Sequence, residues 1–561
     1  MALTKEQLYE ALVDGGVVSK EDFKAAAASR DVKRRGIDGV LISRGKITDE
    51  QAGQMVANWM GVPFINLRQQ EITNEALKLI PESFARTQLI LPVAKRENVI
   101  KIATTDPQNV FLRALLEKYL REEINLVYAT SQDIEDSLFL FQKEPSLVIK
   151  SILEYVKGSE EEESKIIDLV NSFFELAYQG RASDVHIEPE DDYVVIRFRV
   201  DGMLHDISEI PKEFHDSIIS RLKVLARLAI DEHRAAQDGK IRYRSTWGEF
   251  VEIRLSIVPT THGEKAVMRL LSAKAREYNL SDLGLSDRDL VIFQQAIKKP
   301  WGMILVTGPT GSGKTTTLYA ALKVLNKRNV NISTIEDPVE YDIEGINQIQ
   351  VNPKTSLTFA KGLRSVVRQD PDIIMVGEIR DGETADISVN AAMTGHLVLS
   401  TLHTNDAATA FPRIQDMGVE DFLIASTVVS VIAQRLVRRI CLRCIQSEPA
   451  TKQELVAIKK SEKLEKYFKE ITGKKTLNNL RLFHGAGCKV CNGTGYLGRT
   501  GIFEILSVSD SVREALMADH NADEIHDIAI KEGMKSMLYD GVEKVSLGLT
   551  TLSEVMRVTQ E

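Results

Sequence analysis

The chain has few cysteines, no long apolar run and no excess of basic residues, and each shortage excludes a class of protein. Its 4 cysteines are too few and too clustered for the disulfide framework of a secreted protein. No segment reaches the roughly 18 uninterrupted apolar residues that a membrane span needs. Charges among the first residues argue against a signal peptide. We therefore expect a cytoplasmic protein that contacts a membrane only through partners.

Acidic residues outnumber basic ones, since Lys+Arg 71 against Asp+Glu 80 leaves a net charge of -9. A general nucleic-acid binder with a long basic footprint is therefore not expected. Hydrophobic residues at 43% and charged residues at 27% are the balance of a core-forming chain. At about 150 residues per domain, the 561 residues predict three to four domains.

The apolar pattern predicts a multidomain α/β protein. Two similar helical units open the chain, each with a predicted N-cap, Ser19 in the first and Thr48 in the second. In a later unit, strands are expected at 184–187, 193–200, 250–257 and 266–270. The predicted parts are a helical repeat over 1–66, a small α/β domain over 67–145, a linker over 146–164, an α/β unit over 165–272, a linker over 273–287 and an α/β unit over 288–561.

The strongest motif is GPTGSGKT, from Gly308 to Thr315, which matches G-x-x-x-x-G-K-[ST] in full. A predicted strand leads into it and a helix-forming stretch leaves it, so backbone N–H groups and the helix dipole can hold phosphates. Lys314 would reach the β- and γ-phosphates, and Thr315 would ligate Mg²⁺. The predicted nucleotide-binding residues are Gly308, Pro309, Thr310, Gly311, Ser312, Gly313, Lys314, Thr315 and Thr316.

Three further predicted strands of the last unit carry polar residues at their ends. These residues are Glu336, Asp337, Glu340, Glu378, His396 and His403. Ligands bind at the carboxyl ends of the strands in an open parallel sheet, so we expect these groups to converge on the phosphate loop. Hydrolysis needs one carboxylate to orient or deprotonate water and another to support Mg²⁺. The pattern therefore predicts an NTPase rather than a passive nucleotide binder.

All four cysteines lie in two CxxC pairs, Cys441 with Cys444 and Cys488 with Cys491. Paired CxxC knuckles in a cytoplasmic chain are typical of a tetrahedral four-thiolate zinc site, with free thiols or disulfides as the alternatives. Such a site contributes about 10–16 kcal/mol of folding free energy, so the predicted zinc is structural. The zinc module is expected at about 440–495, with a helical excursion over 452–471 between the knuckles.

Four segments of the last unit together resemble a known family. GPTGSGKTTT, TIEDPVEY, RSVVRQDPDIIMVGEIRD and TGHLVLSTLHTNDA look like the Walker A, Asp box, Walker B and His box of the type II/IV secretion ATPase superfamily. The chain is most similar to its type IV pilus assembly (PilB-like) and type II secretion (GspE-like) members. The resemblance implies a RecA-like P-loop NTPase domain, a PAS-like N-terminal half of the motor over 165–272, helical and small α/β N-terminal domains, and a tetracysteine zinc insert.

The resemblance also implies roles for the acidic residues. Glu340 falls on the Asp-box position expected to act as general base, and Glu336 and Asp337 nearby are alternatives. Glu378 matches the Walker B acid near Mg²⁺.

Histidines and arginines carry further implied roles. His396 and His403 match the His-box residues that sense the γ-phosphate in this family. Arg364 and Arg368 lie four apart on one predicted helix face, where they meet either a neighbouring subunit's phosphate or acidic partners.

The unit at 165–272 resembles the half of the motor that closes over the nucleotide and supplies arginines to the phosphates. Arg254 and Arg269 are the expected arginines, with Arg242 behind them. The family often has Arg after QDG, and this chain has Lys240 there. An arginine finger contributes about 10³ to 10⁵ in rate.

The N-terminal repeat resembles a module that binds cyclic di-GMP in some family members. That module's pattern expects Arg-Leu-Gly near the start of each unit, whereas this chain has Gln7-Leu8-Tyr9 and Gly36-Ile37-Asp38. We therefore interpret the repeat as a degenerate adaptor that docks on a partner. The domain at 67–145 resembles the family's second N-terminal domain, which would contact the platform.

The resulting hypothesis is a homo-hexameric ATPase that uses ATP, Mg²⁺ and a structural Zn²⁺. It would work in the cytoplasm, peripheral to the inner membrane, and drive pilin polymerisation through a PilC/GspF-like platform protein. The tetracysteine insert favours an assembly motor, because pilus retraction members generally lack it. The alternatives are a type II secretion motor, a nucleotide-sensing scaffold without significant turnover and, least favoured by the acidic charge, a nucleic-acid translocase.

Overall fold

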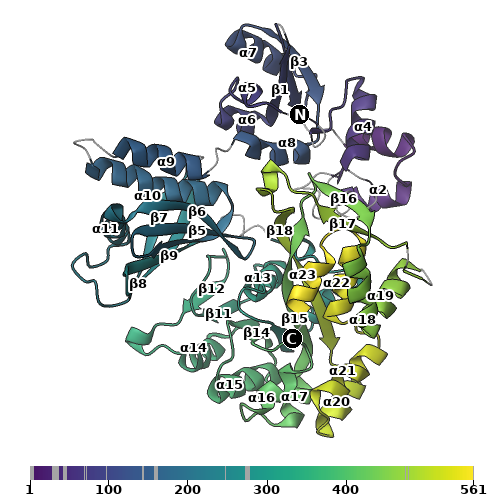
Figure 1. The fold of residues 1–561 in the computed structure, drawn as a ribbon. Helices are drawn as coiled ribbons and strands as arrows, with labels where there is room; N and C mark the ends of the chain where they lie inside the picture. Colours follow the sequence, from purple (N-terminus) through teal and green to yellow (C-terminus); the bar gives the residue numbers. More distant parts are fainter. Residues whose placement is uncertain are drawn as a thin grey trace. The chain divides into compact units, whose positions relative to one another are not determined.

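The computed structural model describes residues 5–27, 37–38, 40–41, 47, 49–67, 70, 72–96, 98–141, 145–156, 162–246, 248–271, 278–473, 476–477 and 479–559 (Figure 1). The chain divides into two units, Met1–Val148 with Cys488–Gly493, and Ile149–Gly487 with Thr494–Glu561. None of the helices in these ranges is long and apolar enough to cross a membrane. Two positions of the predicted repeat, Gly36 and Thr48, lie outside the described residues.

The first unit combines N-terminal helices with a three-stranded sheet of order β1-β2-β3. Ser19 caps its helix as predicted, accepting the N–H of Asp22 at 3.0 Å. The N–H of Ile65 donates to the Tyr128 carbonyl at 2.9 Å, so the predicted boundary at 66 does not separate two independent parts. The elements are α1 Lys5–Tyr9, α2 Lys20–Ala27, α4 Asp49–Met60, α5 Asn74–Leu77, α6 Glu82–Gln88, β1 Ile90–Arg96, β2 Val99–Thr104, α7 Val110–Leu120, β3 Glu123–Tyr128 and α8 Ser131–Ser137.

The predicted linker at 146–164 is mostly helical, and the boundary between the two units at 148/149 falls within it. Helix α9 covers Pro145–Val156 and helix α10 covers Glu162–Gln179. Ile149 and Leu153 are buried four residues apart, the spacing of one helix face. Residues 157–161 of this linker and residues 273–277 of the second predicted linker lie outside the described residues.

The N-terminal part of the second unit is an antiparallel sheet of order β6-β5-β4-β9-β8-β7. In β5, Val194, Ile196 and Phe198 are buried whereas Arg197 and Arg199 alternate with them, so one face is apolar and the other charged. The elements are β4 Ala182–Pro189, β5 Tyr193–Val200, β6 Met203–Pro211, α11 His215–Ala226, β7 Gln237–Arg244, β8 Phe250–Thr260 and β9 Gly263–Leu271. Each of the four predicted strands is present.

The C-terminal part contains the predicted mostly parallel sheet, of order β12-β11-β13-β14-β10-β15-β18. Only β18 is antiparallel to its neighbour among these strands. The strands are β10 Gly302–Thr307, β11 Ile332–Glu336, β12 Asn347–Gln350, β13 Ile373–Val376, β14 Leu397–Leu402, β15 Val428–Ile440 and β18 Tyr496–Ser507. The helices around it are α12 Asp287–Ala296, α13 Lys314–Leu325, α14 Phe359–Val366, α15 Gly382–Met393, α16 Ala410–Gln415, α17 Asp421–Thr427, α20 Asp510–Met517, α21 Ala522–Lys531, α22 Met537–Ser546 and α23 Leu552–Thr559.

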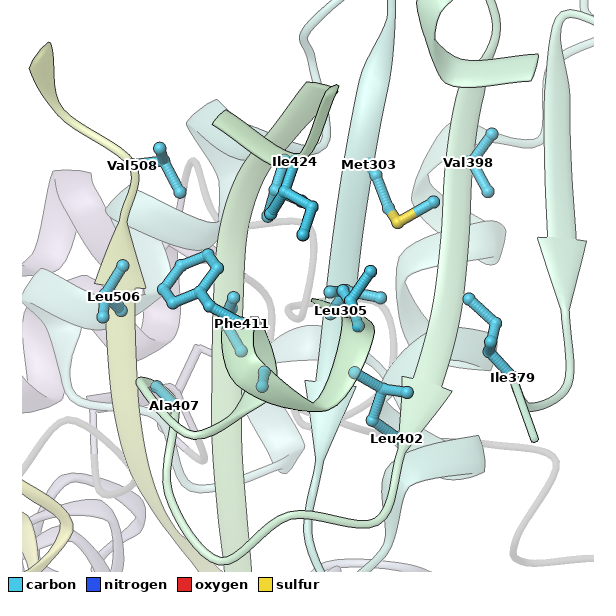
Figure 2. Close-up of a cluster of buried hydrophobic side chains, with 14 of the residues drawn as sticks. Met303, Leu305, Ile379, Val398, Leu402, Ala407, Phe411, Ile424, Leu506 and Val508 are labelled. Atoms are coloured by element: carbon cyan, nitrogen blue, oxygen red, sulfur yellow. The ribbon is translucent and has the colours of Figure 1, made fainter. Parts of the chain in front are cut away.

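The core of this part lies on both faces of the sheet, as burial of a parallel sheet requires. Met303 and Leu305 of β10 join the cluster shown in Figure 2, which also contains Phe411 of α16. The alternate residues Ile304 and Val306 pack on the opposite face, with α12 and α13. This packing fixes the end of β10, from which the phosphate loop leaves.

The segment between the CxxC pairs forms a small α/β insert. Strands β16 Ile445–Pro449 and β17 Arg481–Gly485 pair antiparallel. The predicted helical excursion is present as α18 Lys452–Lys460 and α19 Glu462–Thr472.

Candidate active site and metal centre

The phosphate loop runs from the buried strand β10 to helix α13, as the motif predicts. Gly308 has a φ of +146°, and a Cβ there would lie 2.5 Å from the Gln434 carbonyl oxygen. Only glycine therefore fits this position. The hydroxyl of Ser312 is buried and has no hydrogen-bond partner among the described residues. A loop of this shape with a spare donor fits a phosphate.

Lys314 begins helix α13 and is almost fully buried. Its ammonium donates to the carbonyl of Gly308 at 2.7 Å and to that of Pro309 at 3.2 Å. Burial lowers the pKa of Lys314, and the charge of Glu378 opposes this shift. A desolvated cation held by two loop carbonyls can exchange these partners for phosphate oxygens, which carry full charge.

Gln434 of β15 holds the loop from the neighbouring strand and was not among the site residues predicted from the sequence. Its amide donates to the Ser312 carbonyl at 2.6 Å and accepts from the Thr317 hydroxyl at 2.7 Å. The side chain is 1% exposed. A lone amide within the apolar stretch VVSVIAQ was the available signal, since a buried polar group needs partners.

The carboxyl ends of strands β10, β13 and β14 lie at the same edge of the sheet. Thr307 of β10 pairs with Leu402 of β14, and Val376 of β13 pairs with Ser400 of β14. The hydroxyl of Thr404 bonds that of Thr307, so the segment after β14 is tied to the strand that precedes the phosphate loop. This geometry brings the polar residues that follow β13 and β14 to the phosphate loop.

Glu378 and His403 meet at this edge, as expected. His403 Nε2 lies 3.6 Å from Glu378 Oε2. Burial lowers the pKa of His403, and Lys314 adds to this shift, so a neutral imidazole is favoured near pH 7. Arg380, which the sequence analysis did not single out as a site residue, forms an ion pair with Glu378.

His396 does not join this group, contrary to the expectation that both histidines approach the phosphates. It precedes β14, and its carbonyl accepts the N–H of Gly302 at the opposite end of β10. The six residues of β14, Leu397–Leu402, separate His396 from His403, a distance of about 23 Å at about 3.3 Å per residue. Its Nδ1 lies 2.8 Å from the Ala391 carbonyl oxygen, a local contact outside the site.

The three acids of the Asp box have different environments. Glu336 is 2% exposed and accepts hydrogen bonds from three side chains. Asp337 is exposed, and Glu340 is partly exposed at the same edge. A carboxylate with all its partners inside the fold is poorly placed to take a proton from water, so the geometry favours Glu340 over Glu336.

Arg254 reaches the Asp box and Arg269 does not. The two are cross-strand neighbours of β8 and β9 on the charged sheet face. Arg254 lies 3.1 Å from Glu340 Oε2 and donates to the Val339 carbonyl at 2.7 Å. Arg269 instead pairs with Asp184 at 2.9 Å.

The remaining predicted cations have local partners. Arg242 lies over the Phe250 ring, with its guanidinium carbon 4.2 Å from the ring centroid. Lys240 pairs with Glu252 at 3.6 Å. Arg364 pairs with Glu383 at 2.7 Å. Of the two alternatives for this arginine, a neighbouring subunit's phosphate or an acidic partner, the structure contains the second. Arg368 donates to the Ser365 hydroxyl at 3.4 Å.

The four cysteine sulfurs form a compact cluster. The Sγ atoms of Cys441, Cys444, Cys488 and Cys491 all lie within 4.8 Å of one another. Those of Cys488 and Cys491 are 3.7 Å apart, too far for the bond of about 2.05 Å in a disulfide. Zn–S bonds of about 2.3 Å would place tetrahedral sulfurs about 3.8 Å apart. The cluster therefore fits a zinc ion.

Comparison with known proteins gives matches along most of the chain. The family described as type II/IV secretion system protein matches residues 159–557, and the MshEN domain matches residues 60–145. The type IV pilus assembly ATPase PilB of Myxococcus xanthus is 37% identical, with 98% of each chain covered. The type II secretion system ATPase E of Vibrio cholerae is 46% identical over 72% of this chain and 76% of that protein.

A solved structure shows the same fold. The ATPase DotB of Legionella pneumophila gives a TM-score of 0.51 at 20% identity, covering 70% of this chain and 95% of that one. At this identity the likeness concerns the fold alone.

Proposed function

The chain belongs to the type II/IV secretion system protein family and is an ATPase, and we propose that its ATP turnover drives the assembly of type IV pili. The placement of Lys314, Glu340 and Glu378 after the carboxyl ends of three parallel strands of one sheet is the observation that supports turnover rather than binding alone. Similarity over nearly the full length to a pilus assembly ATPase supports the pilus as the process served. Type II secretion is the second candidate, supported by the more identical relative.

The phosphate loop would bind the β- and γ-phosphates, with Lys314 and the Ser312 hydroxyl as donors that the fold already desolvates. Glu340 would orient the attacking water and accept its proton. Thr315 and Glu378 would hold Mg²⁺, which when bound neutralises the charge that develops on the phosphates. Arg380 pairs with Oε1 of Glu378, so Oε2 would be the oxygen offered to the metal.

Arg254 connects hydrolysis to motion between the two parts of the second unit. It projects from β8 and holds Glu340 on the loop after β11. A phosphate that arrives beside Glu340 competes for this guanidinium, since arginine prefers two charged oxygens in one plane. Exchange of Arg254 between Glu340 and the phosphate would shift the sheet of β4–β9 against the nucleotide site.

We expect Arg254→Ala to lower ATP turnover at least tenfold, because arginine contacts to a transferred phosphate contribute about 10³ or more in the best cases. Arg269→Ala removes the same charge from the neighbouring strand and should lower turnover less than about threefold, as exposed pairs contribute little. Equal losses in the two variants would contradict a specific role for Arg254. Steady-state phosphate release measures both.

The proposed assembly is a homo-hexamer in the cytoplasm, attached to the inner membrane through a platform protein, with a structural zinc in the insert. The first unit would dock on a partner. Gln7 and Tyr9 stand where the cyclic di-GMP pattern has arginine and glycine, which argues against that ligand. Titration of the full chain with cyclic di-GMP decides this, and saturable binding would contradict the adaptor interpretation.

A genetic experiment tests the proposed process. The gene would be deleted in its own host and restored as wild type or as Lys314→Ala, and both surface pili and secreted enzymes would be measured. We expect pili to be lost on deletion and restored by wild type alone. Loss of secreted enzymes with normal pili would support type II secretion instead. Restoration by Lys314→Ala would contradict any motor and favour a nucleotide-sensing scaffold.

A further inference from the structure

A buried hydrogen-bond network joins helix α13 to the loop that carries Glu340. Tyr319, in the second turn of α13, is fully buried. Its hydroxyl donates to Glu336 Oε2. The same hydroxyl accepts the backbone N–H of Glu340 at 3.3 Å and the amide of Gln348 at 3.2 Å. One phenol oxygen therefore contacts the strand end before the loop, the loop itself and the strand after it.

Gln348 of β12 holds the same loop at two further points. Its side-chain oxygen accepts the N–H of Ile343 at 2.7 Å, and its amide approaches the Tyr341 carbonyl at 3.2 Å. The amide also lies 3.2 Å from Glu336 Oε1, which accepts the Thr334 hydroxyl at 2.5 Å. The side chains of Tyr319 and Gln348 thus hydrogen-bond the backbone of the loop between β11 and β12 at residues 340, 341 and 343.

Burial and a neighbouring charge keep the Tyr319 hydroxyl protonated, so that it can donate a hydrogen bond in this network. Burial raises the pKa of Tyr319, and the Glu336 charge raises it further, so the hydroxyl keeps its proton. The Tyr341 ring packs edge-on against the Tyr319 ring, with centroids 4.7 Å apart. Loss of the hydroxyl would leave the Glu340 N–H and the Glu336 carboxylate each short of a partner in a dry environment.

We propose that Tyr319 is a positioning residue for ATP hydrolysis, whose hydroxyl fixes the Glu340 backbone relative to the helix that begins at Lys314. The inference rests on the proposed function, because it assigns Glu340 to the reaction. The P-loop lysine and the carboxylate that acts on water come from different segments, and Tyr319 is a direct link between them. A misplacement of about 1 Å between reacting groups costs as much as 10²-fold in rate.

Tyr319→Phe in the full-length protein tests this role. We expect kcat to fall about tenfold while KM for ATP stays within about twofold, because the phosphate loop itself is unchanged. We also expect faster amide hydrogen exchange in nucleotide-free protein, confined to the loop between β11 and β12. Gln348→Ala, at a half-buried position, should change kcat and exchange in the same direction.

The matched control is Tyr243→Phe, which removes a similar tyrosine–glutamate hydrogen bond, to Glu175 at 2.8 Å, from the antiparallel sheet. It should leave kcat and loop exchange unchanged even if it lowers the melting temperature. Unchanged loop exchange in Tyr319→Phe, or a kcat equal to that of the control, would overturn the positioning role. Hydrogen exchange needs no turnover, so it decides that role separately from the proposed function, which fails if wild-type turnover does not depend on Lys314.

Discussion

Glu340→Gln is expected to lower steady-state ATP turnover by about 10² to 10⁴, the usual contribution of a general base. The amide keeps the shape of the side chain and loses the proton acceptor. ATP affinity should stay within about twofold, since the P-loop residues that hold the phosphates are unchanged. Phosphate release and nucleotide binding, measured on the same preparation, separate the two effects.

Glu344→Gln is the matched control for this prediction. Glu344 lies in the same loop and is exposed, so its carboxylate is removed without loss of an ion pair at the site. We expect turnover close to wild type. A Glu340→Gln variant that also turns over at the wild-type rate would move the base to Asp337 or to another group.

Cys488→Ser is expected to abolish stoichiometric zinc binding and to unfold the insert between the two CxxC pairs. Four thiolates around zinc contribute about 10–16 kcal/mol to folding at neutral pH, more than the net stability of most domains. One serine leaves three thiolates and an alcohol that stays protonated. Metal analysis of the purified protein and protease resistance of residues 440–495 measure the two consequences.

Ser447→Ala is the control for the zinc prediction. The Ser447 hydroxyl contacts Arg481 at 3.2 Å within the same insert and lies outside the sulfur cluster. We expect it to retain one zinc per chain. Full zinc content in Cys488→Ser, or none in wild type, would show that the compact sulfur cluster has another role.

The parts of the site that follow from strand direction could be predicted from the sequence. A motif with a fixed spacing locates the phosphate loop, and acids just after a predicted parallel strand lie at its carboxyl end, as Glu378 does. His396 shows the limit of the same reasoning. One residue before a strand and one after it lie at opposite edges of the sheet. His396 and His403 are therefore separated by the length of β14.

The features of the site that the sequence could not predict depend on contacts between residues far apart in the chain. Arg254 and Arg269 are cross-strand neighbours, yet Arg254 contacts the loop that carries Glu340 whereas Arg269 pairs with Asp184. Tyr319 and Gln434 lie in stretches that read as ordinary core, and only the fold reveals that each supplies hydrogen bonds at the site. Helix α9 lies in the segment predicted as a linker, although its apolar residues have helical spacing.

We propose that this chain hydrolyses ATP at the sheet edge formed by the phosphate loop, Glu378 and Glu340. The most direct test is steady-state phosphate release by purified full-length protein with Mg²⁺, compared with Lys314→Ala prepared in the same way. We expect measurable wild-type turnover and a loss of at least about 10² in the variant, because a donor to the reacting phosphates is removed. Equal rates in the two proteins would contradict it.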